Sequence, residues 1–168
     1  GSPGDYAARV YGEETMRLEF DVQGIPAPKG STRSFRNKKT GGTVTTGDNP
    51  NTKPWQLAVG WCAKDAMCGA PLMGGPVSVG VVFRMPRPKG HYRKDLSLRP
   101  SAPAHHTVKP DLDKLLRAVF DALKHVAWLD DSQVVSLGRC EKRYVSDESA
   151  GARVVVEPVG AVPAGGAT

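Results

Sequence analysis

The spacing of apolar residues predicts four strands and two helices. Apolar and polar residues alternate in the manner of half-buried strands over residues 16–22 (MRLEFDV), 76–85 (PVSVGVVFRM), 133–144 and 152–157. Residues 54–67 follow helical spacing, with Asn51 or Thr52 as the N-cap and Pro54 in the first turn. A second helix begins at Asp111 and ends near His125 or Ala127, and its apolar stripe comprises Leu112, Leu115, Leu116, Val119, Phe120 and Leu123.

The resulting order, β-α-β-α-β-β, favours an α+β fold with a single domain, one mixed sheet and two helices on one face. We expect this domain to span residues 16–157. Residues 1–15 are expected to be a flexible leader that begins with an expression-tag remnant, and residues 158–168 a disordered tail rich in Pro, Gly and Ala. Residues 24–51 and 86–110 are expected to be long loops, which often carry function.

The composition argues against a membrane-spanning protein and against a fold held together by disulfides or cysteine-bound metal. No apolar run approaches the roughly 20 residues of a membrane-spanning helix. The three cysteines, Cys62, Cys68 and Cys140, are odd in number and lack the spacing of metal ligands. We therefore expect reduced thiols, no membrane association and a cytoplasmic location.

Basic residues are concentrated in the two long loops of a chain whose formal net charge is +6. Such clusters attract polyanions and predict a nucleic-acid partner. Lys29 lies on a loop restrained by Pro28 and Gly30, although a solvated side chain remains the alternative for it. The expected phosphate contacts are Lys29, Arg33, Arg36, Lys38, Lys39, Arg87, Lys89, Arg93 and Lys94.

An acidic cluster follows the second basic loop. Its carboxylates would repel the phosphates of a nucleic acid unless a bound cation offsets their charge. A divalent cation suits this role, because Mg²⁺ prefers oxygen ligands and can activate water for phosphodiester hydrolysis. Asp111 and Asp113 can converge at a helix start, and Asp130 and Asp131 offer a third ligand if the chain doubles back along the helix. The alternative is structural: Asp111 caps the helix and Asp113 complements its dipole.

Arg117 lies between two acids on one helix face, since Asp113, Arg117 and Asp121 are spaced at i, i+4 and i+8. One interpretation is a ladder of surface ion pairs. The other is that Arg117 holds the scissile phosphate or stabilises its transition state. His105 and His106 are not expected as ligands of an oxygen-type metal site; a loop that touches DNA or is simply solvated suits them better.

These segments together resemble the RusA family of Holliday junction resolvases, endonucleases encoded mainly by phages and prophages. The resemblance runs in order over about residues 16–156, and its central motif is long. It rests on KPDLDKLLRAVFDAL (109–123), WLDDSQVV (128–135), KRY (142–144), VQGIPAPKG (22–30) and GPVSV (75–79).

The resemblance implies roles for particular residues. Asp111, Asp113 and Asp131 would bind the metal, with the fold bringing Asp131 back to Asp111. A basic residue four positions after the second aspartate, commonly lysine in the family, would be Arg117, which keeps the charge in a planar guanidinium. Lys114 stands where the family often has asparagine. The family is homodimeric, and a two-fold dimer suits a four-way junction, whose resolution requires paired nicks.

We therefore predict a Mg²⁺-dependent, structure-selective crossover junction endodeoxyribonuclease that acts in DNA recombination and repair within a bacterial cytoplasm. Mn²⁺ can substitute at an oxygen site. One alternative is a non-catalytic protein that binds junctions or other DNA and holds a structural cation. Another is a metal-dependent hydrolase of nucleotides, against which the two extended basic loops argue.

Overall fold

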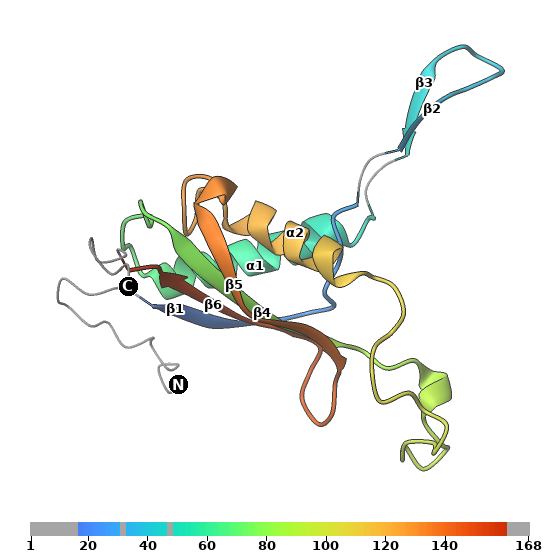
Figure 1. Ribbon diagram of the computed structural model, residues 1–168. Coiled ribbons are helices and arrows are strands. Elements are labelled where there is room, and N and C mark those ends of the chain that lie inside the picture. The colour runs from blue at the N-terminus through green and yellow to red at the C-terminus, as the bar shows by residue number, and fades with distance from the viewer. Residues whose placement is uncertain (1–16, 31–32, 47–48, 161–168) are drawn as a thin grey trace, which may run out of the picture.

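The computed structural model describes residues 17–30, 33–46 and 49–160, with the backbone alone for residues 33–35 and 44–46. Its main sheet has the order β1-β6-β4-β5 and consists of β1 (Leu18–Gln23), β6 (Gly151–Pro158), β4 (Val77–Met85) and β5 (Val134–Tyr144). β6 runs antiparallel to both of its neighbours, whereas β4 and β5 are parallel. The expected α+β class with one mixed main sheet is confirmed (Figure 1).

Two helices, α1 (Thr52–Met67) and α2 (Leu112–Leu123), pack on one face of this sheet (Figure 1). α2 is the crossover that parallel strands require, because it connects β4 to β5. The core between the layers includes Val81 and Phe83 of β4 and Val59 of α1, all fully buried. The observed strands begin and end within two residues of the expected bounds.

α2 ends at Leu123, before the expected end near His125 or Ala127. His125 adopts a left-handed backbone conformation with φ 66°, and its N–H donates to the Trp128 carbonyl at 2.7 Å. This turn reverses the chain after Leu123, so that β5 can run back along the helix. Residues 124–128 thus form a tight turn in place of a further helical turn, and backbone hydrogen bonds within this turn satisfy groups that the helix would have paired.

The segment 24–51, expected to be a loop, contains a hairpin of β2 (Arg33–Arg36) and β3 (Thr43–Thr46). Its turn is fixed by Asn37, whose side chain accepts the Lys39 N–H, and by Gly41, whose φ of 70° favours glycine. The hairpin projects from the body, and so does the segment 86–110, which contains the short 3₁₀ helix η1 (Lys89–His91) (Figure 1). The two segments form arms at one side of the molecule.

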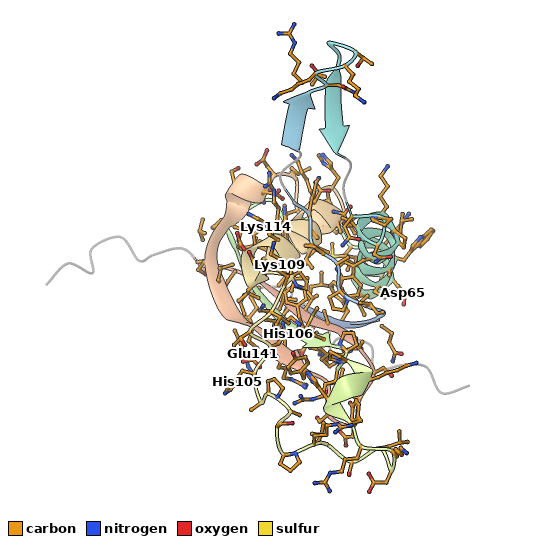
Figure 2. The ribbon with its side chains drawn as sticks, turned by 90° about the vertical axis from the view of Figure 1, so that its right-hand side faces the viewer. Asp65, His105, His106, Lys109, Lys114 and Glu141 are labelled. Carbon is orange, nitrogen blue, oxygen red and sulfur yellow. The ribbon has the colours of Figure 1, made fainter. Side chains whose placement is uncertain are left out.

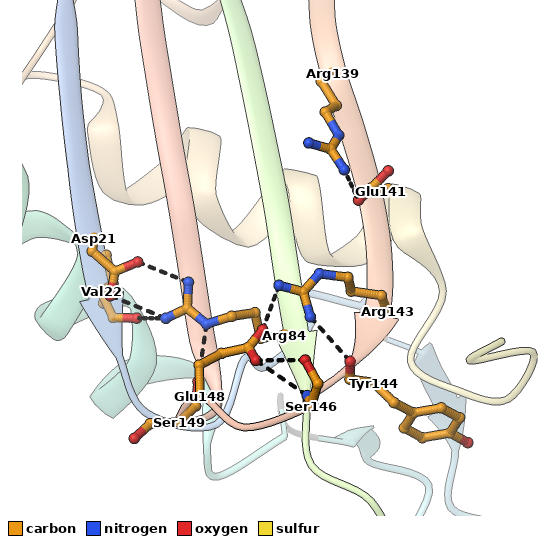
Figure 3. Close-up of polar contacts among 10 residues, drawn as sticks. All are labelled: Asp21, Val22, Arg84, Arg139, Glu141, Arg143, Tyr144, Ser146, Glu148 and Ser149. Atoms are coloured by element: carbon orange, nitrogen blue, oxygen red, sulfur yellow. Dashed lines mark hydrogen bonds and ion pairs between the residues drawn. The ribbon is translucent and has the colours of Figure 1, made fainter. Parts of the chain in front are cut away.

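A partly buried ion pair links Arg84 of β4 to Asp21 of the edge strand β1. Arg84, 7% exposed, donates to both carboxylate oxygens of Asp21 at 2.7 and 3.0 Å and to the Ser149 carbonyl at 2.9 Å (Figure 3). A Cβ added at Gly151 would clash with the backbone carbonyl oxygen of Val22 and lie 2.6 Å from the Arg84 guanidinium, so glycine is needed there. A buried charge is tolerated here because its donors are satisfied.

The expected leader, residues 1–15, lies outside the described residues, and so do residues 161–168 of the expected tail. Among the helices of the described chain, none combines the length and the apolar character needed to cross a membrane.

Candidate active site

The first turn of α2 carries two of the predicted carboxylates. Asp111 occupies the N-cap position with an extended backbone, but its side chain makes no capping hydrogen bond. Asp113 stands in the first turn and is exposed, whereas Leu115, two residues further on, is fully buried. The carboxylate of Asp111 is thus not used to cap the helix, which weakens the purely structural interpretation of this motif.

Asp131 is placed by the turn that follows α2. The indole Nε1 of Trp128, a fully buried side chain, donates to Asp131 Oδ1 at 2.9 Å. Asp130 instead caps the 3₁₀ helix η2 (Asp131–Gln133). Its side chain accepts the Ser132 N–H at 2.8 Å, and the Gln133 side chain in turn accepts the Asp130 N–H at 3.0 Å, which completes a capping box. The two neighbouring acids therefore differ, since Asp130 is used by the fold and Asp131 is held toward solvent by a core residue.

One cavity of about 430 Å³ collects five of these charged side chains along the exposed side of α2. Asp113 lies on the first turn of the helix and Asp131 follows the helix end, with Arg117 on the turns between them. The apolar part of the wall is formed by Leu116, Phe120 and Leu137. The charged lining comprises Lys29, Asp113, Arg117, Asp121 and Asp131.

The ion pairs in this cavity differ from the ladder considered as an alternative. Asp121 pairs with Lys29 at 2.8 Å and accepts the Gln56 amide at 3.0 Å, while Asp113 pairs with Lys114 at 3.1 Å. The hydrogen bond from Lys114 lowers the pKa of Asp113, which keeps that carboxylate ionised. The side chain of Arg117 forms no ion pair or hydrogen bond with any residue that the structure describes, so the ladder interpretation is wrong.

Asp111 opens onto a different cavity, of about 770 Å³, which it shares with Lys109 and Lys114. Within residues 17–30, 33–46 and 49–160, no group of three or more His, Cys, Asp or Glu side chains lies close enough to hold a metal ion. The predicted trio of Asp111, Asp113 and Asp131 therefore stays a prediction, and the structure brings two of its members to one cavity.

The basic arms flank the site on one face of the molecule. Figure 2 places Lys114, Lys109 and His106 between the hairpin at one end and the part of the segment 86–110 that contains η1 at the other. Arg36, Lys38, Lys39, Lys89, Arg93 and Lys94 are exposed as a DNA contact requires. The side chain of Arg33 lies outside the described part of the chain.

Two of the predicted DNA contacts have structural partners. Lys29 is paired with Asp121, as given above. Arg87 is half-buried, donates to the Pro103 carbonyl at 2.7 Å and stacks over the Tyr144 ring at 4.3 Å. His105 is exposed, whereas His106 is buried and is thus not part of a simply solvated loop. Sequence reasoning passed over Lys109 and Lys114, whose position beside the aspartates was the available signal.

Comparisons with known proteins identify the family of the chain. Residues 25–157 match the family model described as Endodeoxyribonuclease RusA. The chain is also 33% identical over 123 residues to the Bacillus subtilis (strain 168) protein named "Uncharacterized protein YqaN", an overlap of 71% of this chain and 83% of that protein. Residues 25–157 include both arms and the cavity lined by Asp113, Arg117 and Asp131, and the resemblance read from the motifs is confirmed. The chain therefore belongs to the RusA family of endodeoxyribonucleases.

Proposed function

We propose that the protein is a Mg²⁺-dependent endonuclease that resolves four-way DNA junctions by paired phosphodiester hydrolysis in recombination or repair. Its family implies a junction-resolving endonuclease. The observation that carries the proposal for this chain is the cavity in which Asp113 and Asp131 share a wall with Arg117, whose guanidinium is not neutralised by a described acid. Carboxylates and a free cation side by side suit a metal and a phosphate together.

The donor set fits the proposed ion. Mg²⁺ is usually bound by one or two carboxylates together with substrate phosphates and waters, so Asp113 and Asp131 suffice and Asp111 can join from the adjacent cavity. Mn²⁺ fits the same oxygen donors. When bound, the ion supplies an activated water and offsets charge on the leaving oxygen.

The chain's own residues perform the remaining tasks. Arg117 binds a non-bridging oxygen of the scissile phosphate and holds it during the reaction. Trp128 orients Asp131, and the Lys29–Asp121 pair fastens the segment 25–30 against α2. The exposed cations of the two arms contact phosphates on either side of the cut, which gives binding that depends on shape and weakens with salt.

We also propose that two copies of the chain act together. β5 is an edge strand of the main sheet, and Val135 and Leu137 on it are 59% and 54% exposed. An open edge with apolar side chains is a surface that proteins usually cover. A second copy on this edge would relate two catalytic cavities by a two-fold axis, which matches the near two-fold symmetry of a four-way junction.

The test is cleavage of a labelled synthetic four-way junction, compared with a linear duplex, in Mg²⁺ and in EDTA. Asp113→Asn is the active-site variant. Asp65→Asn is its matched control, because Asp65 is an exposed carboxylate of α1 on neither cavity. We expect junction cleavage by the unaltered chain and by Asp65→Asn, and none by Asp113→Asn or in EDTA. Cutting that survives Asp113→Asn would refute the mechanism.

Junction binding without any cutting would support the second candidate, a non-catalytic DNA-binding protein. The exposed cations of the arms are the observation that favours it, since they serve binding whether or not hydrolysis follows.

A further inference from the structure

The cavity of about 770 Å³ adjoins the candidate active site. Asp111 and Lys114 line it, while Asp113 lines the catalytic cavity. The wall between the two is fixed by the Lys29 N–H, which donates to the Lys114 carbonyl at 3.1 Å, and by the Lys114–Asp113 ion pair. Asp111 is the N-cap of α2, and Asp113 lies two residues further along the chain. A strand whose phosphate occupies the catalytic cavity therefore brings a neighbouring base within reach of the second cavity.

The walls of this cavity are rigid and largely apolar. Proline loses almost no side-chain entropy when a ligand packs against it, so walls of proline bind a flat ring at low cost. Tyr144, 7% exposed, adds an aromatic surface that is fixed by the Arg87 guanidinium at 4.3 Å and the His91 ring at 5.4 Å. The prolines that line the cavity are Pro26, Pro28, Pro86, Pro88 and Pro110.

His106 adds an unused polar group to this lining. Its side chain is only 7% exposed and packs edge-on to Tyr144 at 4.9 Å, and its Nδ1 has no hydrogen-bond partner within the described chain. Buried polar atoms are normally paired, so an unpaired one indicates a missing partner. Burial, followed by the charge of Lys142, lowers the pKa of His106, so that the neutral ring offers one donor and one acceptor.

The rim carries groups that recognise nucleotides. Asn49 and Asn51 offer carboxamides of the kind that pair with base edges, and Lys109 and Lys114 offer charges for a phosphate. Lys142 holds the rim in place, because its Nζ donates to the carbonyls of Val108 and Pro110 at 2.7 and 2.9 Å. An occupant with a flat apolar body, a polar edge and an attached phosphate suits the prolines, the asparagines and the lysines of this lining.

We propose that this cavity receives one unstacked nucleobase of the branched strand, next to the phosphate that is cut. The proposal rests on the proposed function, because the catalytic cavity brings the DNA strand within reach of this one. Its volume lies within the range of about 300–1,000 Å³ typical of small-molecule sites, which leaves room for a base and its sugar. A branch point is where a base leaves the stack at low cost, since the continuous stacking of the duplex is interrupted there.

The test fills the cavity with a side chain. Gly30 lines it, and a Cβ added there meets no atom within 4 Å, so Gly30→Phe blocks the cavity without a backbone clash. Gly160→Phe is the matched control, since Gly160 is equally open and lines neither cavity. Binding is measured to four-way junctions that carry 2-aminopurine, whose emission changes when it leaves the stack, in turn at each nucleotide flanking the branch point. Ca²⁺ replaces Mg²⁺, because it is too large for the octahedral geometry that Mg²⁺ demands.

We expect an emission change at one position with the unaltered chain and with Gly160→Phe, and none with Gly30→Phe. Stacking of one base on an aromatic side chain implies binding about fivefold to about a hundredfold weaker for Gly30→Phe. An abasic site at the same position should then weaken binding by the unaltered chain but add nothing to Gly30→Phe. Gly30→Phe behaving like Gly160→Phe would overturn the proposal.

The two proposals fail in different ways. Junction cleavage in Mg²⁺ without any position-specific emission change would refute the base site and leave the endonuclease standing. An emission change that Gly30→Phe abolishes, in a protein that cuts no junction, would refute the hydrolysis and leave the base site standing.

Discussion

Trp128→Phe tests whether the buried indole positions Asp131 for metal binding. The substitution removes a 2.9 Å hydrogen bond to a carboxylate and leaves the core otherwise aromatic. A hydrogen bond to a charged group contributes about 1.5–3 kcal/mol to stability, and the exposed side of Asp131 argues for the lower end because water replaces the lost donor. Three missing ring atoms add about 2 kcal/mol. The free energy of unfolding should thus fall by about 3.5 kcal/mol.

The effect on the metal is separable from this loss of stability. Partners that orient metal-binding groups typically change metal affinity by about 10- to 100-fold, so the half-saturating Mg²⁺ concentration should rise by about that factor. Junction cleavage is measured across a Mg²⁺ titration and corrected for the folded fraction.

The matched control is Phe83→Ala, a fully buried site on β4 whose truncation costs about 3–5 kcal/mol without touching Asp131. Phe83→Ala should leave the Mg²⁺ midpoint unchanged. Equal midpoints for Trp128→Phe and Phe83→Ala would show that the indole has a structural role alone.

Arg117→Ala should lower the single-turnover cleavage rate about 100-fold. Arg117→Lys should recover most of that rate. The control Arg17→Ala, which alters an arginine paired with Glu19 and Glu157, should leave the rate unchanged. An undiminished rate in Arg117→Ala would exclude a phosphate contact. Replacing Lys38 and Lys39 with alanine should reduce the slope of log affinity against log salt by about 2, because each phosphate contact contributes about 0.9. An unchanged slope would place the hairpin off the DNA. The pKa of Glu148 is lowered to about 2 by its own backbone N–H, the Ser146 hydroxyl and the Arg143 guanidinium (Figure 3). A lowered carboxyl pKa stabilises the fold above the unfolded value near 4.5, and that contribution disappears as the pH falls through about 2. Glu148→Gln should therefore be less stable than the unaltered chain in urea at pH 7, with the difference vanishing toward pH 2; a difference independent of pH would contradict this.

The hairpin and His106 show where local pattern was insufficient. The run TVTT has β-branched residues that favour a strand, but it is short and flanked by polar turn residues, so the segment 24–51 gave no alternation long enough to predict. His106 follows an exposed histidine in a loop rich in proline, and its burial depends on Tyr144 and Lys142 of β5. Contacts between segments that are distant in the chain do not appear in the local spacing of apolar residues from which elements are predicted.

The sequence by itself determined the four strands of the main sheet, the two α-helices and the face of α2 on which Asp113 and Arg117 lie. A period of 3.6 residues puts Leu115 and Val119 into the core and Asp113 and Arg117 into solvent, whatever the helix packs against. The motif around these residues also determined the family. Both conclusions follow from residues close together in the chain.

Tertiary structure alone decided which charges are free and which are used. Asp121 is neutralised by Lys29 from the other end of the chain, Trp128 turns Asp131 toward the cavity, and Asp111 opens onto the neighbouring one. The physical reason is that an ion pair or an oriented carboxylate depends on partners brought together by folding. Spacing along a helix shows which side chains share a face, but it does not show which of them another segment will bind.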